Sequence, residues 1–517
     1  MSRQRILILD FGGQYTQLIA RRVREAGVYS EILPFQASPE ILDTDAPAGV
    51  VLSGGPESVA DAEAPRCHPA WLEARVPVLG ICYGMQLMVS ELGGTVEPSS
   101  RREYGRSSVE LEAGSSRLLD GWSSGDPVWM SHGDTARNLP AGYRVTARSD
   151  GVIAAIESAD ARRCGIQFHP EVHHTPRGPT LLSNFVFDIC GCEPSWTPET
   201  FVDDLVADVQ AKVGDASVLC ALSGGVDSAV TALLLRRALG GRVVCVMVDT
   251  GLLRLGERAA LERSFEERLE FPVHVVDAKR RFLDALSGIE DPEMKRKIIG
   301  REFIEIFARE AERLASSRGE RFDFLAQGTL YPDVIESVSV RGPSVTIKSH
   351  HNVGGLPEHM PMGLIEPLRE LFKDEVRRLG VELGLDDEFV HRHPFPGPGL
   401  AVRVLGSIDE ERLERVRGAD AIFIEEIRRA ELYGAVWQAF AVLLPVRSVG
   451  VMGDNRTYDE VIALRAVHSV DGMTADWVPL PHEVLQRTAA RVANEVEGVN
   501  RVVYDISTKP PATIEWE

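Results

Sequence analysis

The sequence predicts two α/β domains, each built on a parallel sheet, followed by a smaller α+β domain. In the first two thirds of the chain, short apolar runs end in turns of small residues, and helical patterns follow those turns. Such alternation is typical of parallel sheets, whose functional groups lie at the carboxyl ends of the strands. Proline-flanked segments at 194–198 and 394–399 interrupt the pattern. We therefore expect domains at 1–193, 194–393 and 394–517.

Composition argues against several classes of protein. The 517 residues are 44% hydrophobic and 26% charged, which is ordinary for globular chains. The net charge of −21 argues against a nucleic acid or an anionic membrane as a partner. No apolar run approaches the roughly 20 residues that span a bilayer, and the amino terminus runs into a strand without a signal-peptide pattern. The seven cysteines lack the spacing of a zinc site, so we expect a reduced, cytoplasmic enzyme.

Cys82 is the first candidate for chemistry. The first domain has expected strands at 6–9, 50–52 and 76–79 and expected helices at 15–26 and 85–92. Cys82 follows the third strand and lies between Gly80 and Gly84, a pattern that forms a sharp elbow and exposes a nucleophile at a helix amino terminus. The helix dipole there favours the reactive thiolate. The alternative is a small buried apolar residue, an interpretation that fits the other cysteines in or beside apolar runs: Cys164, Cys220 and Cys245.

A partner base for Cys82 lies downstream, in the segment Gly165–Glu171. His169 can accept the thiol proton, and Glu171 can fix the imidazole tautomer and stabilise the charged ring. A spacing of two places both side chains on one face of an extended segment, although Pro170 leaves the local geometry open. The backbone N–H groups of Gly54 and Tyr83 are candidates for an oxyanion hole.

These motifs resemble a known family. The class I glutamine amidotransferase pattern is similar to three segments of this chain, GICYGMQ, SGGP and FHPE, which together span about a hundred residues. The resemblance implies that Cys82 is the nucleophile, His169 the base and Glu171 its orienting partner. It also implies that glutamine is bound by Gln86, Ser131 and His132, and that the reaction releases ammonia through a γ-glutamyl thioester.

The middle domain contains a candidate phosphate loop. An apolar strand at 218–222 runs into Ser223-Gly224-Gly225-Val226-Asp227-Ser228, and an apolar helix pattern follows. Backbone N–H groups and a helix amino terminus converge on an anion in this arrangement. The lysine of the Walker pattern is absent, and Asp227 stands where it can hold a metal that neutralises phosphates. The alternative is a tight strand-to-helix turn capped by serines.

This loop resembles the signature of ATP pyrophosphatases, which split ATP between its α and β phosphates. The resemblance implies that ATP with Mg²⁺ binds at the loop, and it favours Lys373 as a phosphate clamp over an exposed helix lysine. It makes Val248 a candidate adenine contact, although Val248 is equally well interpreted as an ordinary core residue of its strand. The basic triplet 295–297 contains Arg296, a candidate for a substrate phosphate or a solvated turn residue. The polar segment 347–357 is either a lid over phosphates or a solvated loop.

The last domain has strand patterns at 445–452, 461–467 and 501–506 and a helix pattern at 481–496. It contains no nucleophile or metal cluster, so we expect it to pair with a second copy and to complete a substrate site. FPGPGLAVRV, LPVRSVGVMGD and KPPATIEWE resemble the carboxyl-terminal domain of the glutamine-hydrolysing GMP synthetase family. That resemblance implies that Lys509 and Glu515, with Arg296, contact xanthosine 5′-monophosphate (XMP).

The order of the three domains implies the reaction of this family. ATP adenylates XMP, and ammonia from glutamine displaces AMP to give GMP, in a homodimer that needs Mg²⁺ and no organic prosthetic group. Two alternatives within enzymes are an NAD synthetase and a tRNA-modifying enzyme. The acidic charge disfavours the tRNA-modifying enzyme, and the tail KPPATIEWE disfavours both. A regulatory protein that senses nucleotides is a third, and it would have no need of the set Cys82, His169 and Glu171.

Overall fold

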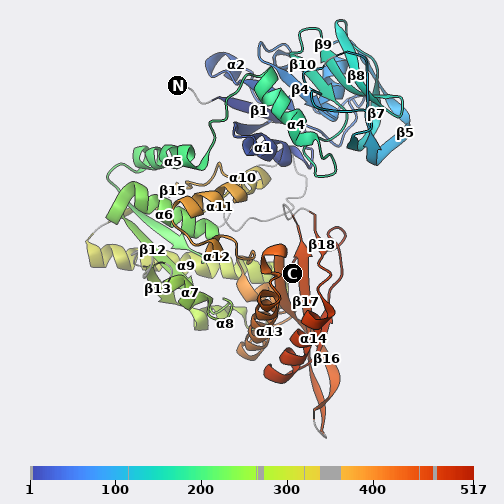
Figure 1. Cartoon of the computed structure of the whole chain (residues 1–517). Helices are drawn as coiled ribbons and strands as arrows, with labels where there is room; N and C mark the ends of the chain where they lie inside the picture. Colours follow the sequence, from blue (N-terminus) through green and yellow to red (C-terminus); the bar gives the residue numbers. More distant parts are fainter. Residues whose placement is uncertain are drawn as a thin grey trace. The chain divides into compact units, whose positions relative to one another are not determined.

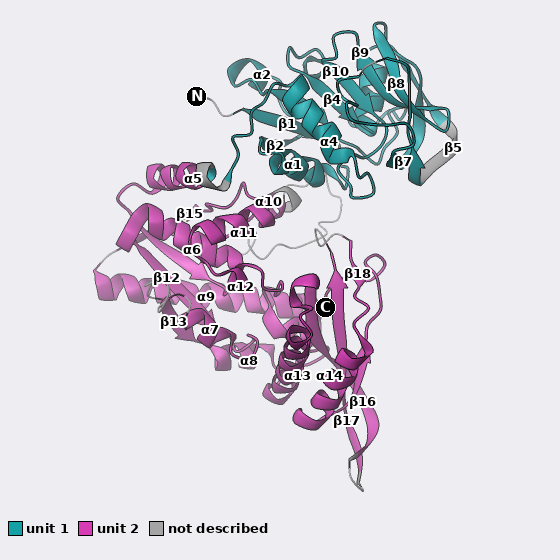
Figure 2. Cartoon of the chain, viewed as in Figure 1, with its two compact units in different colours: residues 1–201, 338–345 teal, residues 202–337, 346–517 magenta. Residues whose placement is uncertain are grey.

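The computed structural model describes residues 4–114, 116–263, 265, 273–319, 321–337, 362–452, 455–469 and 474–517. These form two compact units (Figure 2), one covering residues up to 201 and the other the described residues from 202 onwards. The division falls within helix α5, Pro198–Val213. The predicted domain boundaries at 193/194 and 393/394 stay predictions. The segment 347–357, interpreted as either a lid or a solvated loop, lies outside the described residues.

The first unit is organised around an eight-stranded sheet of order β2-β1-β3-β4-β10-β9-β8-β6. The five strands from β2 to β10 are parallel, as the sequence predicts, and the last three are antiparallel. The strands are β1 Arg5–Asp10, β2 Tyr29–Pro34, β3 Gly49–Leu52, β4 Val78–Ile81, β6 Glu110–Leu111, β8 Tyr143–Ser149, β9 Val152–Ser158 and β10 Arg163–Ile166. A separate antiparallel pair is formed by β5 Thr95–Ser108 and β7 Pro127–Asn138.

Helices cover this sheet and connect its parallel strands (Figure 1). The described helical segments are α1 Thr16–Glu25, α2 Ile41–Thr44, η1 Pro69–Trp71, α3 Tyr83–Glu91, α4 Gly178–Ser183 and η2 Asn184–Ile189. The strands β1, β3 and β4 are almost wholly buried, and their apolar side chains pack with α3 in one core. Continuous apolar runs of this kind are expected of parallel strands buried on both faces.

The second unit contains a five-stranded parallel sheet of order β13-β12-β11-β14-β15. The chain adds β12 and β13 on one side of β11 and then β14 and β15 on the other, so a topological switch point lies beside β11. The strands are β11 Ser217–Leu222, β12 Val243–Asp249, β13 Val273–Asp277, β14 Phe322–Ala326 and β15 Gly363–Ile365. The helical segments are α6 Val226–Leu239, η3 Gly240–Arg242, α7 Glu257–Arg263, α8 Lys279–Leu286, α9 Pro292–Arg318, α10 Tyr331–Ser337, α11 Lys373–Glu382 and α12 Asp387–Val390.

The remainder of this unit has the predicted α+β composition. Strand β17 pairs with β16 and β18 in antiparallel fashion and with β19 in parallel fashion. The elements are η5 Gly399–Arg403, α13 Glu410–Arg429, η6 Tyr433–Ala435, β16 Gln438–Met452, β17 Asn455–His468, β18 Asp476–Trp477, α14 His482–Glu495 and β19 Val499–Tyr504. One continuous apolar core runs from β12, α8 and α9 into α13, β16 and β17, which is why these parts form a single unit.

Candidate active sites

Cys82 lies at the predicted elbow between β4 and α3. Its backbone has φ 52° and ψ −107°, a conformation that costs energy for a residue with a side chain. Both flanking positions require glycine. A methyl group on Gly80 would lie 2.6 Å from the Met85 nitrogen, and one on Gly84 would lie 2.2 Å from the Leu52 carbonyl oxygen. The tight packing of the elbow therefore holds Cys82 in its strained conformation.

His169 and Glu171 form the predicted pair. The His169 Nδ1 lies 2.7 Å from Glu171 Oε1, and the two side chains are only 7% and 1% exposed. Burial disfavours a charged imidazole, but the Glu171 carboxylate and a hydrogen bond with Cys82 outweigh it and raise the pKa of His169 to about 10. The Arg22 Nε donates to the Glu171 carbonyl at 3.1 Å, and the Tyr15 ring lies edge-on to His169 at 5.1 Å. The structure therefore brings together the three predicted catalytic residues.

Gly54 and Tyr83 lie beside these groups. A methyl group on Gly54 would lie 3.3 Å from His169 Cε1 and 3.8 Å from Cys82 Cβ. Within the described part of the chain, neither the Gly54 N–H nor the Tyr83 N–H donates a hydrogen bond. The Ser53 hydroxyl donates to the Gly54 carbonyl at 2.8 Å, which orients the loop. Both N–H groups are thus available to an oxyanion, and this assignment stays a prediction.

The three residues predicted to bind glutamine lie on α3 and β7. The Cys82 thiol lies 3.7 Å from the Ser131 carbonyl on β7. The His132 Nδ1 lies 3.0 Å from the Asp134 carbonyl, and Gln86 Nε2 donates to the same oxygen at 3.0 Å. Gln86 is 3% exposed, so in this structure it connects α3 to β7. The contacts of these residues with glutamine stay predictions.

Sequence reasoning missed Gln167. This residue is fully buried, its Nε2 lies 3.6 Å from Cys82 Sγ, and its Oε1 accepts from Gln86 at 3.2 Å. A signal was available in its spacing, because Gln167 lies two positions before His169 and alternate residues of an extended segment share a face.

The second site is the loop from Ser223 to Ser228, at the carboxyl end of β11 beside the switch point. The Ser223 N–H donates to the Ser228 hydroxyl at 3.2 Å, and that hydroxyl donates to the Gly225 carbonyl at 3.0 Å. Gly224 has φ +84°, and a methyl group there would lie 2.8 Å from Leu261 Cδ1. These bonds form a compact loop at the amino terminus of α6, which begins at Val226, so its N–H groups suit an anion.

Asp227 and Lys373 meet at this loop. The Lys373 Nζ lies 2.5 and 2.6 Å from the two carboxylate oxygens of Asp227. Lys373 is the first residue of α11, and the two side chains are 42% and 28% exposed. Both charged groups therefore remain accessible from solvent. Lys373 is at the loop, as the phosphate-clamp prediction requires.

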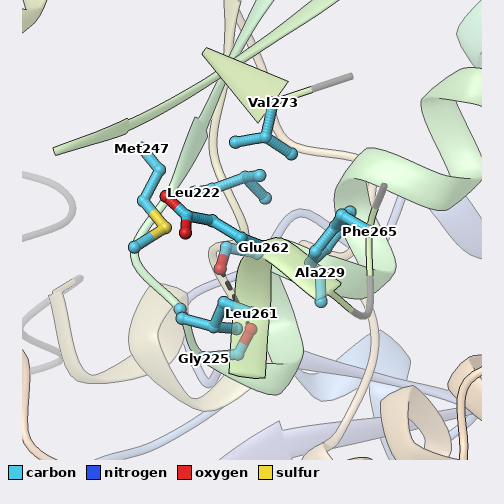
Figure 3. A pocket seen from close by; sticks show the side chains of 10 residues that line it. Leu222, Gly225, Ala229, Met247, Leu261, Glu262, Phe265 and Val273 are labelled. Atoms are coloured by element: carbon cyan, nitrogen blue, oxygen red, sulfur yellow. Dashed lines mark hydrogen bonds between the residues drawn. The ribbon is translucent and has the colours of Figure 1, made fainter. Parts of the chain in front are cut away.

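An apolar pocket adjoins the loop (Figure 3). Its walls come from β11, α6, β12, β13 and the end of α7. The lining residues include Leu222, Ala229, Met247, Leu261, Glu262, Phe265 and Val273. The β12 residue in this lining is Met247, whereas Val248 belongs to the core shared with α8 and α9. Adjacent strand residues face opposite sides of a sheet. The structure thus places the Val248 side chain in the core, as one of its two interpretations has it, and its contact with adenine stays a prediction. Met247 is a further candidate that sequence reasoning missed.

The residues predicted to bind XMP have distinct surroundings. Arg296 pairs with Glu293 at 2.9 Å on the surface of α9. The Lys509 backbone exchanges two hydrogen bonds with Ala475, of 2.8 and 3.1 Å. Glu515 accepts from Arg403 at 3.0 Å and from Gln438 at 2.7 Å. The XMP contacts themselves stay predictions.

Buried cations hold the chain end, and sequence reasoning missed them. Lys295, fully buried, donates to Glu517 at 2.6 Å and to the Val404 carbonyl at 2.7 Å. Arg465, also fully buried, donates to the carbonyls of Thr513 and Ile514 at 2.9 and 2.8 Å. The tail is therefore docked, as its prolines and alternating charge predict.

No helix in the described ranges is long and apolar enough to cross a membrane. The same ranges contain no cluster of three or more metal-binding side chains.

Comparisons with known proteins identify the family of the chain. The family model for class I glutamine amidotransferases matches residues 7–189, and the model for the GMP synthase carboxyl-terminal domain matches residues 425–516. A glutamine-hydrolysing GMP synthase of Phenylobacterium zucineum is 56% identical over 519 aligned residues, which cover 99% of this chain and 99% of the relative. One from Rhodopseudomonas palustris is 57% identical over 99% of this chain and 95% of the relative. The chain belongs to the family of glutamine-hydrolysing GMP synthases.

Proposed function

We propose that this chain converts XMP to GMP with ATP and with ammonia taken from glutamine, releasing AMP, pyrophosphate and glutamate. The observation that carries the proposal is the buried set of Cys82, His169 and Glu171 in a chain that matches GMP synthases over its full length. The full-length match favours this reaction over the NAD synthetase and tRNA-modifying alternatives, because it includes the carboxyl-terminal domain.

The glutaminase steps follow from the geometry of the first unit. His169 accepts the proton of Cys82, and the thiolate attacks the side-chain amide carbon of glutamine. The N–H groups of Gly54 and Tyr83 face the developing oxyanion. The imidazolium then gives its proton to the departing ammonia, and Glu171 stabilises that charged ring. A water molecule, deprotonated by His169, hydrolyses the thioester and releases glutamate.

The synthetase steps use the loop Ser223–Ser228. Loop N–H groups and the serine hydroxyls bind the ATP phosphates, and Met247, in the apolar lining beside the loop, is the candidate contact for the adenine. Lys373 stabilises negative charge on the phosphates. The C2 oxygen of XMP attacks the α phosphorus and pyrophosphate leaves; ammonia then attacks C2 and AMP leaves.

The cofactor in this proposal is Mg²⁺, and the residues present fit it. Asp227 offers two carboxylate oxygens at the loop and is partly exposed. Mg²⁺ is usually held by one or two carboxylates together with substrate phosphates and water. When bound with ATP, the ion neutralises phosphate charge, and Asp227 is the residue that would hold it.

We propose Arg296, Lys509 and Glu515 as the XMP contacts, and a homodimer as the assembly. Exposed apolar side chains on β16, β17 and β19 support pairing with a second copy: Val446, Val449, Val451, Tyr458 and Val503. Sedimentation of the purified chain tests the dimer. The seven cysteines are all free, which supports the expected cytoplasmic compartment.

The test of the reaction is AMP and GMP formation from ATP and XMP with an ammonium salt in place of glutamine. We expect both products, dependent on XMP. Cys82→Ala should abolish glutamine-dependent synthesis and keep ammonia-dependent synthesis. AMP formation that is insensitive to XMP would refute the acceptor, and retained glutamine use by Cys82→Ala would refute the nucleophile.

A further inference from the structure

We propose that Gln167 is a catalytic residue of the glutaminase site, whose side-chain amide donates a hydrogen bond to the Cys82 sulfur and stabilises the thiolate. The proposal rests on the proposed role of Cys82 as the nucleophile. It assigns a chemical role to a buried polar residue outside the set Cys82, His169 and Glu171.

The position of Gln167 is fixed by the backbone. Gln167 immediately follows β10, and the Cys82 N–H donates to the carbonyl of its neighbour Ile166 at 2.7 Å. This bond joins the elbow to the end of β10. The Gln167 Nε2 lies 3.6 Å from Cys82 Sγ, within hydrogen-bond range for sulfur, and the side chain is fully buried.

The orientation of the amide is fixed by its neighbours. The Gln86 Nε2 lies 3.2 Å from Gln167 Oε1 and 3.0 Å from the Asp134 carbonyl oxygen. Because the Gln86 amide group donates to both oxygens, the oxygen of Gln167 is engaged and its NH₂ group faces the sulfur. A flipped Gln167 would place two NH₂ groups together and an amide oxygen against the thiolate, and both contacts repel.

A donor at this place favours the ionised form of the thiol. Cys82 is 4% exposed, so water supplies little solvation to a negative sulfur. A hydrogen bond to a charged form stabilises that form over the neutral one. The titratable groups around the sulfur are His169 with Glu171 and, from β7, His132, which interacts electrostatically with His169. Gln167 forms no bond in the reaction: the thiol proton goes to His169, and the sulfur electron pair attacks the amide carbon.

The experiment measures the rate of Cys82 alkylation by iodoacetamide as a function of pH in the full chain. Peptide mass spectrometry separates Cys82 from the other six cysteines. The test variant is Gln167→Met, which keeps length and removes the donor. The matched control is Gln4→Met. Gln4 precedes β1 and so lies at the amino edge of the parallel strands, whereas Cys82 follows β4 at the carboxyl edge.

We expect the midpoint of the pH–rate curve to rise by about one pH unit in Gln167→Met, from the usual strength of a hydrogen bond to a charged group. Gln4→Met should keep the wild-type midpoint. Glutamine-dependent synthesis should fall by about tenfold in Gln167→Met, while ammonia-dependent synthesis stays unchanged.

The proposal would be overturned if the midpoint of the alkylation curve did not move in Gln167→Met while Cys82→Ala abolished glutamate release. Gln167 would then be a packing residue. If thermal melting shows that Gln167→Met does not fold, Gln167→Asn decides in the same way, because its shorter side chain keeps the amide but withdraws it from the sulfur. Glutamate release by Cys82→Ala would instead refute the nucleophile on which the proposal rests.

Discussion

Replacement of Glu171 by glutamine tests the electrostatic design of the glutaminase site. The change removes one charge and keeps the shape, so Oε1 of the new amide can still accept from His169. The Glu171 Oε2 is buried and has no hydrogen-bond partner within the described ranges, which gives the new NH₂ group a place without displacing a donor. We therefore expect Glu171→Gln to fold, while the imidazolium of His169 loses the negative charge beside it.

The magnitude follows from the contact. The carboxylate lies 2.7 Å from His169 Nδ1, and both side chains are nearly excluded from water. A hydrogen bond between charged groups contributes about 1.5–3 kcal/mol. Because about 1.4 kcal/mol corresponds to a tenfold rate change, we expect glutamate release to fall by roughly 10- to 150-fold. The pKa of His169, now about 10, should also fall.

The assay is glutamate release in the presence of ATP and XMP, with ammonia-dependent AMP formation as the internal control. The second activity should be unchanged, because it does not use His169. A glutamate release rate within about twofold of the wild type would refute the reasoning, since it would show that the buried charge does not support catalysis. A parallel loss of ammonia-dependent activity would show that the variant had lost its fold instead.

Two further predictions concern the second unit. Lys373→Gln removes the cation that contacts both oxygens of Asp227. We therefore expect AMP formation to fall by on the order of 100-fold with either nitrogen donor, while alkylation of Cys82 is unchanged. A loss confined to the glutamine assay would contradict the clamp role. His393 accepts from the Ala439 N–H and bonds the Tyr433 carbonyl as a neutral ring, and burial lowers its pKa from 6.5 to about 4. Its contribution to stability, about 3 kcal/mol, is therefore present above pH 6.5, is lost progressively as the pH falls from 6.5 towards 4, and is gone below 4. Urea unfolding followed between pH 7 and 4 should show a shallower pH dependence for His393→Gln than for the wild type, and parallel curves would refute this assignment.

The chemistry-bearing turns could be predicted from the sequence because their backbone requirements are local. A side chain at Gly80 would collide with the Met85 nitrogen, and one at Gly84 with the Leu52 carbonyl. Glycine at both positions is therefore visible in the sequence as a sign of the elbow. Gly224 has a positive φ, which glycine adopts without strain, so this glycine likewise indicates the turn of the loop 223–228.

Other features were not predictable from local pattern. Strand β12 is buried along its whole length, so it shows no alternation to tell which of Met247 and Val248 faces the pocket. The antiparallel strands β9 and β8 extend the first sheet. Their place in it follows from the pairing of β9 with β10 and not from a strand–helix repeat that the sequence shows. Gln167 gains its role only because α3 and β7 bring Gln86 and the Asp134 carbonyl beside it.

By itself, the sequence determined the elbow at Cys82, the pairing of His169 with Glu171, the glycine-containing loop 223–228 and the α/β class, because each depends on residues close together in the chain. Only the tertiary structure decided the partners of the buried charges. Arg403 meets Glu515 across 112 residues, and Lys295 meets Glu517 across 222. No local pattern encodes such pairs, since a charge buried in the fold takes whichever opposite charge the packing of distant elements brings to it.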